Sequence, residues 1–167
     1  MAYTLDKMAS EMKAVLNKGA GPAELEATRQ LVAKALKDEE FVETHLGKNA
    51  QGERNILYED PDLGFCILAH VYKGAKTSKP HDHGPGWAIY GQAFGETNMK
   101  DYQIVEKGSG EKPTKVKETK VYKLTPGDAR VYQVGDVHCP FRESETRLIR
   151  IESQNMDRVE RTKIELA

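Results

Sequence analysis

This sequence has few cysteines and no excess of either charge. Only two of its 167 residues are cysteines, Cys66 and Cys139, so no disulfide framework is predicted and both are expected as free thiols. With 25 Lys and Arg against 26 Asp and Glu, the formal net charge is −1, and the basic footprint of proteins that bind nucleic acids or anionic membranes is absent. A small-molecule partner is therefore expected, with no nucleic acid and no membrane.

A long apolar run is missing as well. Residues 1–20 alternate charged and apolar side chains, so they match neither a signal peptide nor a membrane span, and we expect a cytoplasmic protein. Hydrophobic residues make up 38% of the chain and charged residues 31%, which is ordinary for a globular protein and too apolar for a disordered one. The length fits a single core.

The N-terminal quarter has the apolar spacing of helices. Leu5, Met8 and Met12 recur at three- and four-residue steps, which predicts one amphipathic helix that Thr4 could cap. Pro22 is placed to open a second helix, since proline is favoured in the first turn. A third, short helix is expected over residues 38–46, before Gly47.

From residue 54 onwards the pattern changes to short runs of β-branched and aromatic residues, broken by turn-forming residues at intervals of roughly ten. Strands are expected near residues 54–59, 64–72, 87–94, 97–105, 115–124, 129–133, 136–142, 147–152 and 159–166. So many short strands indicate a mainly β protein, in particular a jelly roll. The lysine-rich segment 106–123 is expected to form an exposed hairpin without a binding role.

The strongest chemical signal is a pair of histidines two residues apart, in the run Pro80-His81-Asp82-His83. In a strand, residues two apart point the same way, so both imidazoles can reach one point while the residue between them faces away. His138 lies on a later predicted strand and could supply a third nitrogen to a metal ion.

The glycines around these histidines resemble the two motifs of the cupin superfamily, G-x5-H-x-H-x3-4-E-x6-G and G-x5-P-x-G-x2-H-x3-N. The matching residues are Gly74, His81, His83 and Gly95 for the first motif and Gly127, Gly135 and His138 for the second. The resemblance covers about residues 50–152 and implies a cupin jelly-roll β-barrel with a short N-terminal helical segment. We expect residues 1–47 to form the helical segment packed on the barrel, and residues 48–167 to form the cupin barrel.

The departures from these motifs are informative. Trp87 or Ala88 stands where the family has its metal-binding glutamate, Gln133 replaces the proline, and Arg142 replaces the asparagine. The ligand set that remains is three neutral imidazoles with no carboxylate. Within the cupins this resembles the thiol dioxygenases, the cysteine dioxygenase and 3-mercaptopropionate dioxygenase group, which also lack the glutamate.

The same group suggests a role for one arginine. Its Arg-Asn pair precedes the histidines much as Arg54-Asn55 does here, and in that family the arginine grips the substrate carboxylate. A guanidinium suits this task because it donates two parallel charge-assisted hydrogen bonds. The resemblance thus implies Arg54 as a carboxylate clamp; a surface arginine at the start of a strand is the alternative.

One family feature is absent. The thiol dioxygenases carry a Ser-His-Tyr relay on a strand after the third ligand, whereas no histidine or tyrosine follows His138 here. Cysteine is therefore a doubtful substrate. Six polar residues could replace the relay if they face inward: Arg130, Arg150, Glu152, Tyr90, Gln92 and Tyr132. Of these we take Tyr90 as a second catalytic candidate beside Arg54.

Whether Arg150 or Glu152 could replace the relay depends on which side of the strand at 147–152 faces the barrel interior. Ile149 and Ile151 lie on one face, and Arg150 and Glu152 lie on the other. The ordinary interpretation is that the charged pair faces solvent, although a barrel with a polar interior could reverse it.

The leading hypothesis is a non-haem Fe(II) dioxygenase that acts on a small thiol-containing or other chelating organic acid, with O2 as cosubstrate and one divalent metal ion as cofactor. Zn, Ni or Mn are alternatives to iron. A three-His β-diketone dioxygenase is the nearest rival in chemistry. A non-redox metal-binding cupin, acting as an isomerase, lyase or small-molecule sensor, is a second class, and histidines that merely pack are a third. The resemblance also implies a homodimer.

Overall fold

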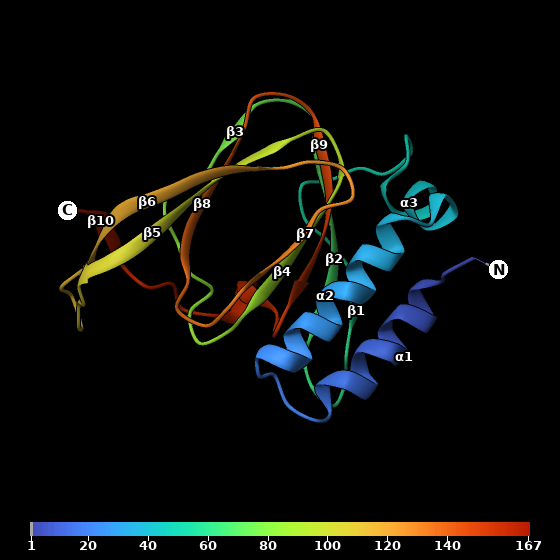
Figure 1. The fold of residues 1–167 in the computed structure, drawn as a ribbon, viewed down its shortest axis with the longest axis horizontal. Helices are drawn as coiled ribbons and strands as arrows, with labels where there is room; N and C mark the ends of the chain where they lie inside the picture. The colour runs from blue at the N-terminus through green and yellow to red at the C-terminus, as the bar shows by residue number, and fades with distance from the viewer. Residues whose placement is uncertain (1) are drawn as a thin grey trace.

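The computed structural model describes residues 2–167, and over these residues three helices precede a series of short strands (Figure 1). The helices are α1 (Leu5–Leu16), α2 (Pro22–Leu36) and α3 (Glu39–Leu46). The strands are β1 (Asn55–Glu59), β2 (Cys66–Tyr72), β3 (Lys76–Thr77), β4 (Ala88–Phe94), β5 (Thr97–Glu106), β6 (Thr114–Leu124), β7 (Ala129–Tyr132), β8 (Val137–Arg142), β9 (Thr146–Glu152) and β10 (Ile164–Leu166). A 3-10 turn, η1 (Met156–Arg158), precedes the last strand.

Each helix begins where the sequence places a start signal. The Thr4 side chain accepts a hydrogen bond from the backbone N–H of Lys7 at 3.1 Å, and Asp38 accepts one from the N–H of Phe41 at 3.0 Å. Pro22 occupies the first turn of α2, where its missing N–H has no intrahelical partner to lose. All three predicted helices are confirmed.

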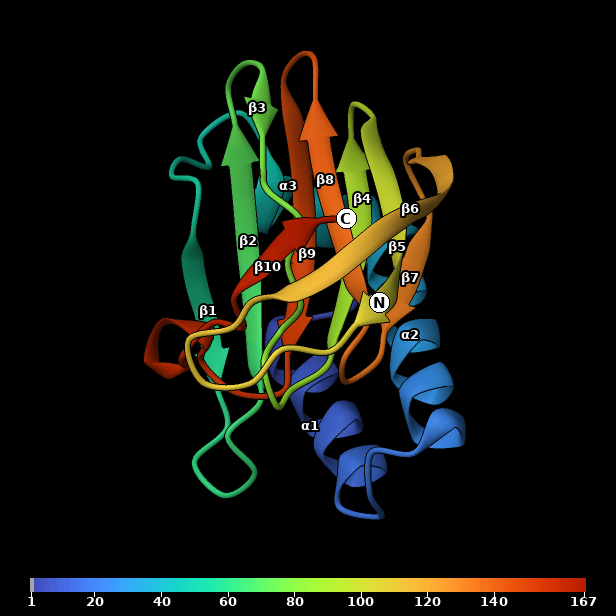
Figure 2. The same cartoon turned by 90° about the vertical axis from the view of Figure 1, so that its left-hand side faces the viewer.

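The strands form two five-stranded sheets, one in the order β1-β2-β9-β4-β7 and the other in the order β10-β6-β5-β8-β3. Without the outermost strands β1 and β10, each sheet alternates strands from the first four, β2–β5, with strands from the last four, β6–β9. This is the double Greek-key order of a jelly roll. The predicted mainly β jelly-roll barrel with an N-terminal helical segment is confirmed. Figure 2 shows the side away from the helices, where β10 runs beside β6.

The strands differ from the prediction in two places. The strand β3 was not predicted, because its two residues are too few to show an alternating pattern; it pairs with β8 only through Lys76 and Thr77. The strand predicted over residues 159–166 is wrong for its first half, because η1 and an irregular segment occupy the chain as far as Lys163. Only Ile164–Leu166 pairs with β6, in parallel.

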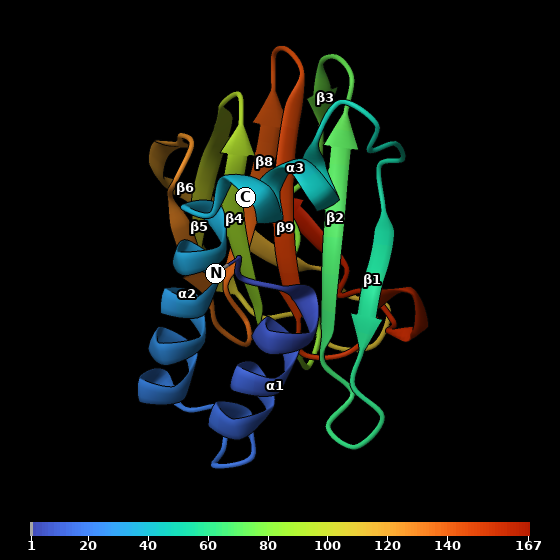
Figure 3. The same ribbon diagram turned by 90° about the vertical axis from the view of Figure 1, so that its right-hand side faces the viewer.

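The helices cover the outer face of the first sheet (Figure 3), and a buried apolar layer lies between them. Met8, Met12 and Val32 of the helices share this layer with Ile89 and Ile151 of the sheet. Residues two apart along a strand share a face, so the odd-numbered residues of β2, β4 and β9 pack on the helices and the even-numbered ones face the barrel interior. Within residues 2–167, no helix combines the length and the apolar character that a membrane crossing requires.

This layering overturns the expected facing of β9. Ile149 and Ile151 pack under the helices, so Arg150 and Glu152 point into the barrel, where Glu152 is fully buried. The solvent-facing interpretation was wrong because it assumed that the apolar face of the strand was the barrel interior. Here a second, helical layer supplies the apolar environment for Ile149 and Ile151, and the barrel interior takes the charged pair.

Candidate metal and anion site

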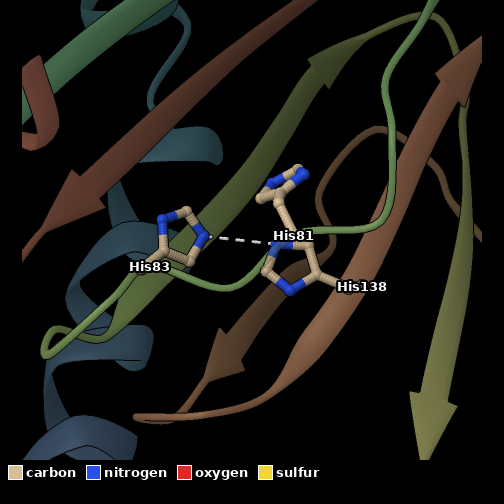
Figure 4. A group of neighbouring side chains, drawn as sticks. All are labelled: His81, His83 and His138. Atoms are coloured by element: carbon tan, nitrogen blue, oxygen red, sulfur yellow. Dashed lines mark hydrogen bonds between the residues drawn. The ribbon is translucent and has the colours of Figure 1, made fainter. Parts of the chain in front are cut away.

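The three predicted metal ligands lie together inside the barrel (Figure 4). His138 belongs to β8, and His81 pairs with it through two backbone hydrogen bonds of 2.9 Å, one in each direction. The segment that carries His81 and His83 is a loop, and this isolated bridge is not part of a strand, so strand alternation is not what aligns the two rings. Asp82 lies outside the group; its side chain accepts a hydrogen bond from the N–H of Gly84 at 2.9 Å.

The ring nitrogens converge with defined protonation. The Nδ1 atom of His81 lies 2.8 Å from the carbonyl oxygen of Lys79, and that of His138 lies 3.2 Å from the carbonyl oxygen of Asp136. A carbonyl only accepts, so both Nδ1 atoms carry the proton and both Nε2 atoms keep a lone pair. One ligand atom from each of the three histidines lies within 4.8 Å of the others, and the Nε2 atoms of His83 and His138 are 3.2 Å apart.

Burial keeps these imidazoles neutral. Desolvation lowers the pKa of His81 to about 4 and moves the pKa of His83 and His138 further below the ordinary value; the neighbouring histidines and Arg150 add to the effect. Neutral imidazole is the form that binds a metal ion.

The donor set fits a divalent transition metal. Two of the rings donate Nδ1–H to a backbone carbonyl, the arrangement that orients metal-binding histidines. The Nδ1 atom of His83 is buried and has no hydrogen-bond partner, so nothing within the chain fixes the protonation of that ring. Over the described part of the chain the cluster contains no carboxylate. Three neutral nitrogens suit Fe(II), Zn, Ni or Mn.

The hydroxyl of Tyr90 adjoins this cluster. Tyr90 lies on β4, is almost fully buried, and places its oxygen 3.2 Å from Nε2 of His138 and 3.4 Å from Nε2 of His83. Burial raises its pKa, so the hydroxyl keeps its proton and can donate a hydrogen bond. Tyr132 of β7 stacks on His138 with ring centroids 4.2 Å apart and holds that ring from the other side.

Arg54 lies elsewhere. Its guanidinium donates to Glu152 through Nη1 at 3.0 Å and Nη2 at 2.9 Å, and its Nε donates to Asp157 at 3.0 Å. It is not among the residues that line the cavity beside His81. The two parallel bonds that a substrate carboxylate would need are thus made to Glu152 of the same chain.

Beside His81 is an open cavity of about 490 Å³. It is lined by residues of β2, β8 and β9, by the loop at 78–81 and by the segment at 161–164. Three arginines line it, Arg142, Arg150 and Arg161, and no aspartate or glutamate does. Its positive charge favours an anionic ligand.

Arg142 is the site residue that the sequence argument missed. It differs from the cupin motif at the asparagine position, and its register could have identified it: His138, Pro140 and Arg142 are two apart on β8 and share one face. The register alone did not point to Arg142, because an arginine is ordinarily expected at the surface.

Comparisons with known proteins find only distant structural likenesses. No protein-family model matches the chain, and no curated protein sequence matches it. Among solved structures, KdgF from Halomonas sp. is 18% identical, with a TM-score of 0.45 over 59% of this chain and 74% of that one. A cupin-2 domain protein from Shewanella frigidimarina is 14% identical, with a TM-score of 0.43 over 62% of this chain and 81% of the other. An oxalate oxidase in complex with the substrate analogue glycolate is 16% identical, with a TM-score of 0.42 over 55% of this chain and 43% of that one. Likenesses this distant assign no chemistry, so function must be argued from the residues of this chain.

Proposed function

We propose that this protein is a non-haem iron dioxygenase that oxidises a small chelating organic acid. The observation that carries the proposal is the group of His81, His83 and His138, three neutral nitrogen donors without a carboxylate, next to a cavity lined by arginines. A ligand set without a negative charge leaves the full charge of a divalent ion available to an anionic substrate.

Each part of the site has a task in this proposal. The three imidazoles would hold the ion, and the carbonyl groups of Lys79 and Asp136 orient two of them. Fe(II) bound there would supply the one-electron chemistry with O2 that no side chain offers. Tyr90, with its hydroxyl beside two of the Nε2 atoms, would donate a hydrogen bond to the reacting acid or to O2.

Two kinds of substrate fit the surroundings of the histidines. A thiol acid and the enolate of a β-diketone each bind a metal through two atoms. Each is an anion, which suits an arginine-lined cavity. The Ser-His-Tyr relay of the thiol dioxygenases has no counterpart in the sequence after His138, so a substrate that needs no such relay, as in β-diketone dioxygenases, is an equal candidate.

Metal analysis and oxygen uptake test the proposal together. Protein purified without added metal would be analysed for iron, zinc, nickel and manganese. It would then be loaded with Fe(II) and offered thiol acids, β-diketones and α-hydroxy ketones in an oxygen electrode. We expect iron binding and substrate-dependent O2 consumption that a His83→Ala variant lacks. The iron-loaded protein consuming no O2 with any of these compounds would refute the proposal.

A second class remains because three imidazoles serve non-redox metals as well. Zinc, nickel or manganese bound in preference to iron, together with activity that is unchanged without oxygen, would identify a metal-dependent isomerase, lyase or small-molecule sensor instead.

A further inference from the structure

Arg142 is a buried cation without a carboxylate partner. Its residue is only 2% exposed, its Nε donates to Thr97 Oγ1 at 3.2 Å, and its Nη2 atom is buried with no hydrogen-bond partner. Its guanidinium lies over the ring of Tyr72, 4.4 Å from the centroid, so one face is packed and its N–H edge is left for hydrogen bonds. A buried charge is costly unless a partner of opposite charge is supplied.

Arg150 is only partly neutralised. Its Nη1 reaches Glu152 at 3.3 Å, whereas Arg54 already makes two shorter bonds with that carboxylate. The Nε atom of Arg150 is buried and has no partner, and its guanidinium lies 4.5 Å from the ring centroid of Tyr90. Arg54 and Arg150 thus share one buried carboxylate, Arg142 has none, and the excess positive charge is at Arg142 and Arg150.

Both arginines open on the cavity that His81 also lines. The two come from different sheets, Arg142 from the end of β8 and Arg150 from within β9. The lining contains no acidic residue, so the cavity offers an anion the unused donors of two arginines together with His81, one of the three clustered histidines.

We propose that Arg142 and Arg150 bind the carboxylate of a small acid whose chelating end is directed to His81, His83 and His138. This rests on the proposed function for the chelating end, and it assigns to these two residues the role that the sequence suggested for Arg54. A planar carboxylate accepts several charge-assisted N–H bonds from guanidinium groups, which a neutral amide or ester cannot match.

Binding measured without turnover tests this. The full chain as purified, with its metal content recorded, would be titrated calorimetrically with 3-mercaptopropionate and succinate, with the amides that replace their carboxylates, and with inorganic phosphate. We expect each acid to bind about tenfold or more tightly than its amide, the ratio for losing one charged hydrogen-bonded contact. Amides that bind as well as the acids, or phosphate that binds more tightly than either acid, would overturn the assignment.

Variants then locate the carboxylate. Arg142→Met should weaken acid binding about tenfold or more and abolish the preference over the amide, while Arg142→Lys should restore part of it. Arg158→Met is the matched control, because Arg158 is an exposed arginine that pairs with Glu59 outside the cavity. Without ligand, Arg142→Met should unfold at a higher temperature than the unchanged protein, since it removes a buried charge that nothing in the chain neutralises.

A purely structural role for Arg142 predicts the opposite pattern, with a lower unfolding temperature and an intact preference for the acid; that result would refute the proposal. If Arg142→Met does not fold, Arg150→Lys and the comparison of acid and amide on the unchanged protein still decide it. Acid binding that depends on the arginines, without any O2 uptake, would refute the proposed oxidation and leave this assignment standing.

Discussion

Arg54 and Glu152 are 98 residues apart in the sequence and are joined by two parallel hydrogen bonds, Nη2 to Oε1 at 2.9 Å and Nη1 to Oε2 at 3.0 Å. Asn155 accepts a third bond from Nη2 at 3.2 Å, and Met156 donates its backbone N–H to the carboxylate at 3.3 Å. This pair connects the residue before β1 to the end of β9 and anchors the turn that follows. Glu152 is fully buried, and its arginine partners balance its charge.

Removing the arginine should therefore destabilise the fold. In an Arg54→Met variant Glu152 would keep Arg150 as its one cationic partner, and we expect the free energy of unfolding to fall by about 2 kcal/mol, below the range for a fully buried pair because Arg54 is partly exposed. Urea denaturation followed by circular dichroism measures this. Arg158→Met, which breaks an exposed pair with Glu59, should change stability little. An Arg54→Met protein as stable as the unchanged one would contradict the structural role of the pair.

The same pair predicts a pH dependence. Burial alone would raise the pKa of Glu152, but hydrogen bonds from Arg54 and the charge of Arg150 outweigh it and hold the pKa below its ordinary value. A carboxylate with a lowered folded-state pKa stabilises the fold above its unfolded pKa, and the contribution is lost as the pH falls through the folded one. The stability difference between the unchanged protein and Arg54→Met should thus be constant near neutral pH and shrink below about pH 4.5. A difference that grows on acidification would exclude this origin.

Metal content should depend on the barrel histidines alone. We expect His81→Ala and His83→Ala to lose the bound ion, because two nitrogens remain where three converge. His45→Gln is the matched control: His45 packs against Phe41 in α3, with ring centroids 4.7 Å apart, and should leave the metal content unchanged. Elemental analysis of protein purified under identical conditions gives the answer, with circular dichroism to establish folding. Equal metal content in all three variants would mean that the histidines only pack.

Close packing of α2 on the sheet depends on one glycine. A Cβ atom on Gly91 would lie 2.5 Å from Cγ1 of Val32 and 3.1 Å from Cδ1 of Leu36, so Gly91→Ala forces these side chains or the helix that carries them to shift. We expect a loss of about 1–3 kcal/mol in the free energy of unfolding, as for other overpacked cores. Chemical denaturation measures the loss.

Two further variants test the cause. Val32→Ala combined with Gly91→Ala should recover part of the loss, because the clashing methyl group is gone. Gly74→Ala is the control, since a Cβ there meets nothing within 4 Å and should be tolerated. A double variant that is no more stable than the additive sum of the single ones would show that the two residues do not compete for the same space.

Local signals in the sequence were enough to predict most of the elements. Thr4, Pro22 and Asp38 mark the helix starts through interactions with the next few residues, and most strands follow from period-two runs bounded by turn residues. The sequence also predicted that His81, His83 and His138 would meet, and the structure brings them together, although a loop and not a strand carries the first two. The shortest strands were not predicted correctly, since the two residues of β3 and the three of β10 are held only by pairing with distant strands.

Local patterns thus predict the elements and the candidate ligands, whereas the packing of the helices on the sheet determines which face of each strand is the interior. Ile149 and Ile151 could pack in a barrel or under a helix layer with the same alternation, and only the position of the helices sends Arg150 and Glu152 inward. Tertiary structure also decided the partners of the arginines. The arginine that pairs with Glu152 is 98 residues away from it in the sequence, and the arginines with unpaired atoms are left for a ligand. No local pattern encodes contacts over such a separation.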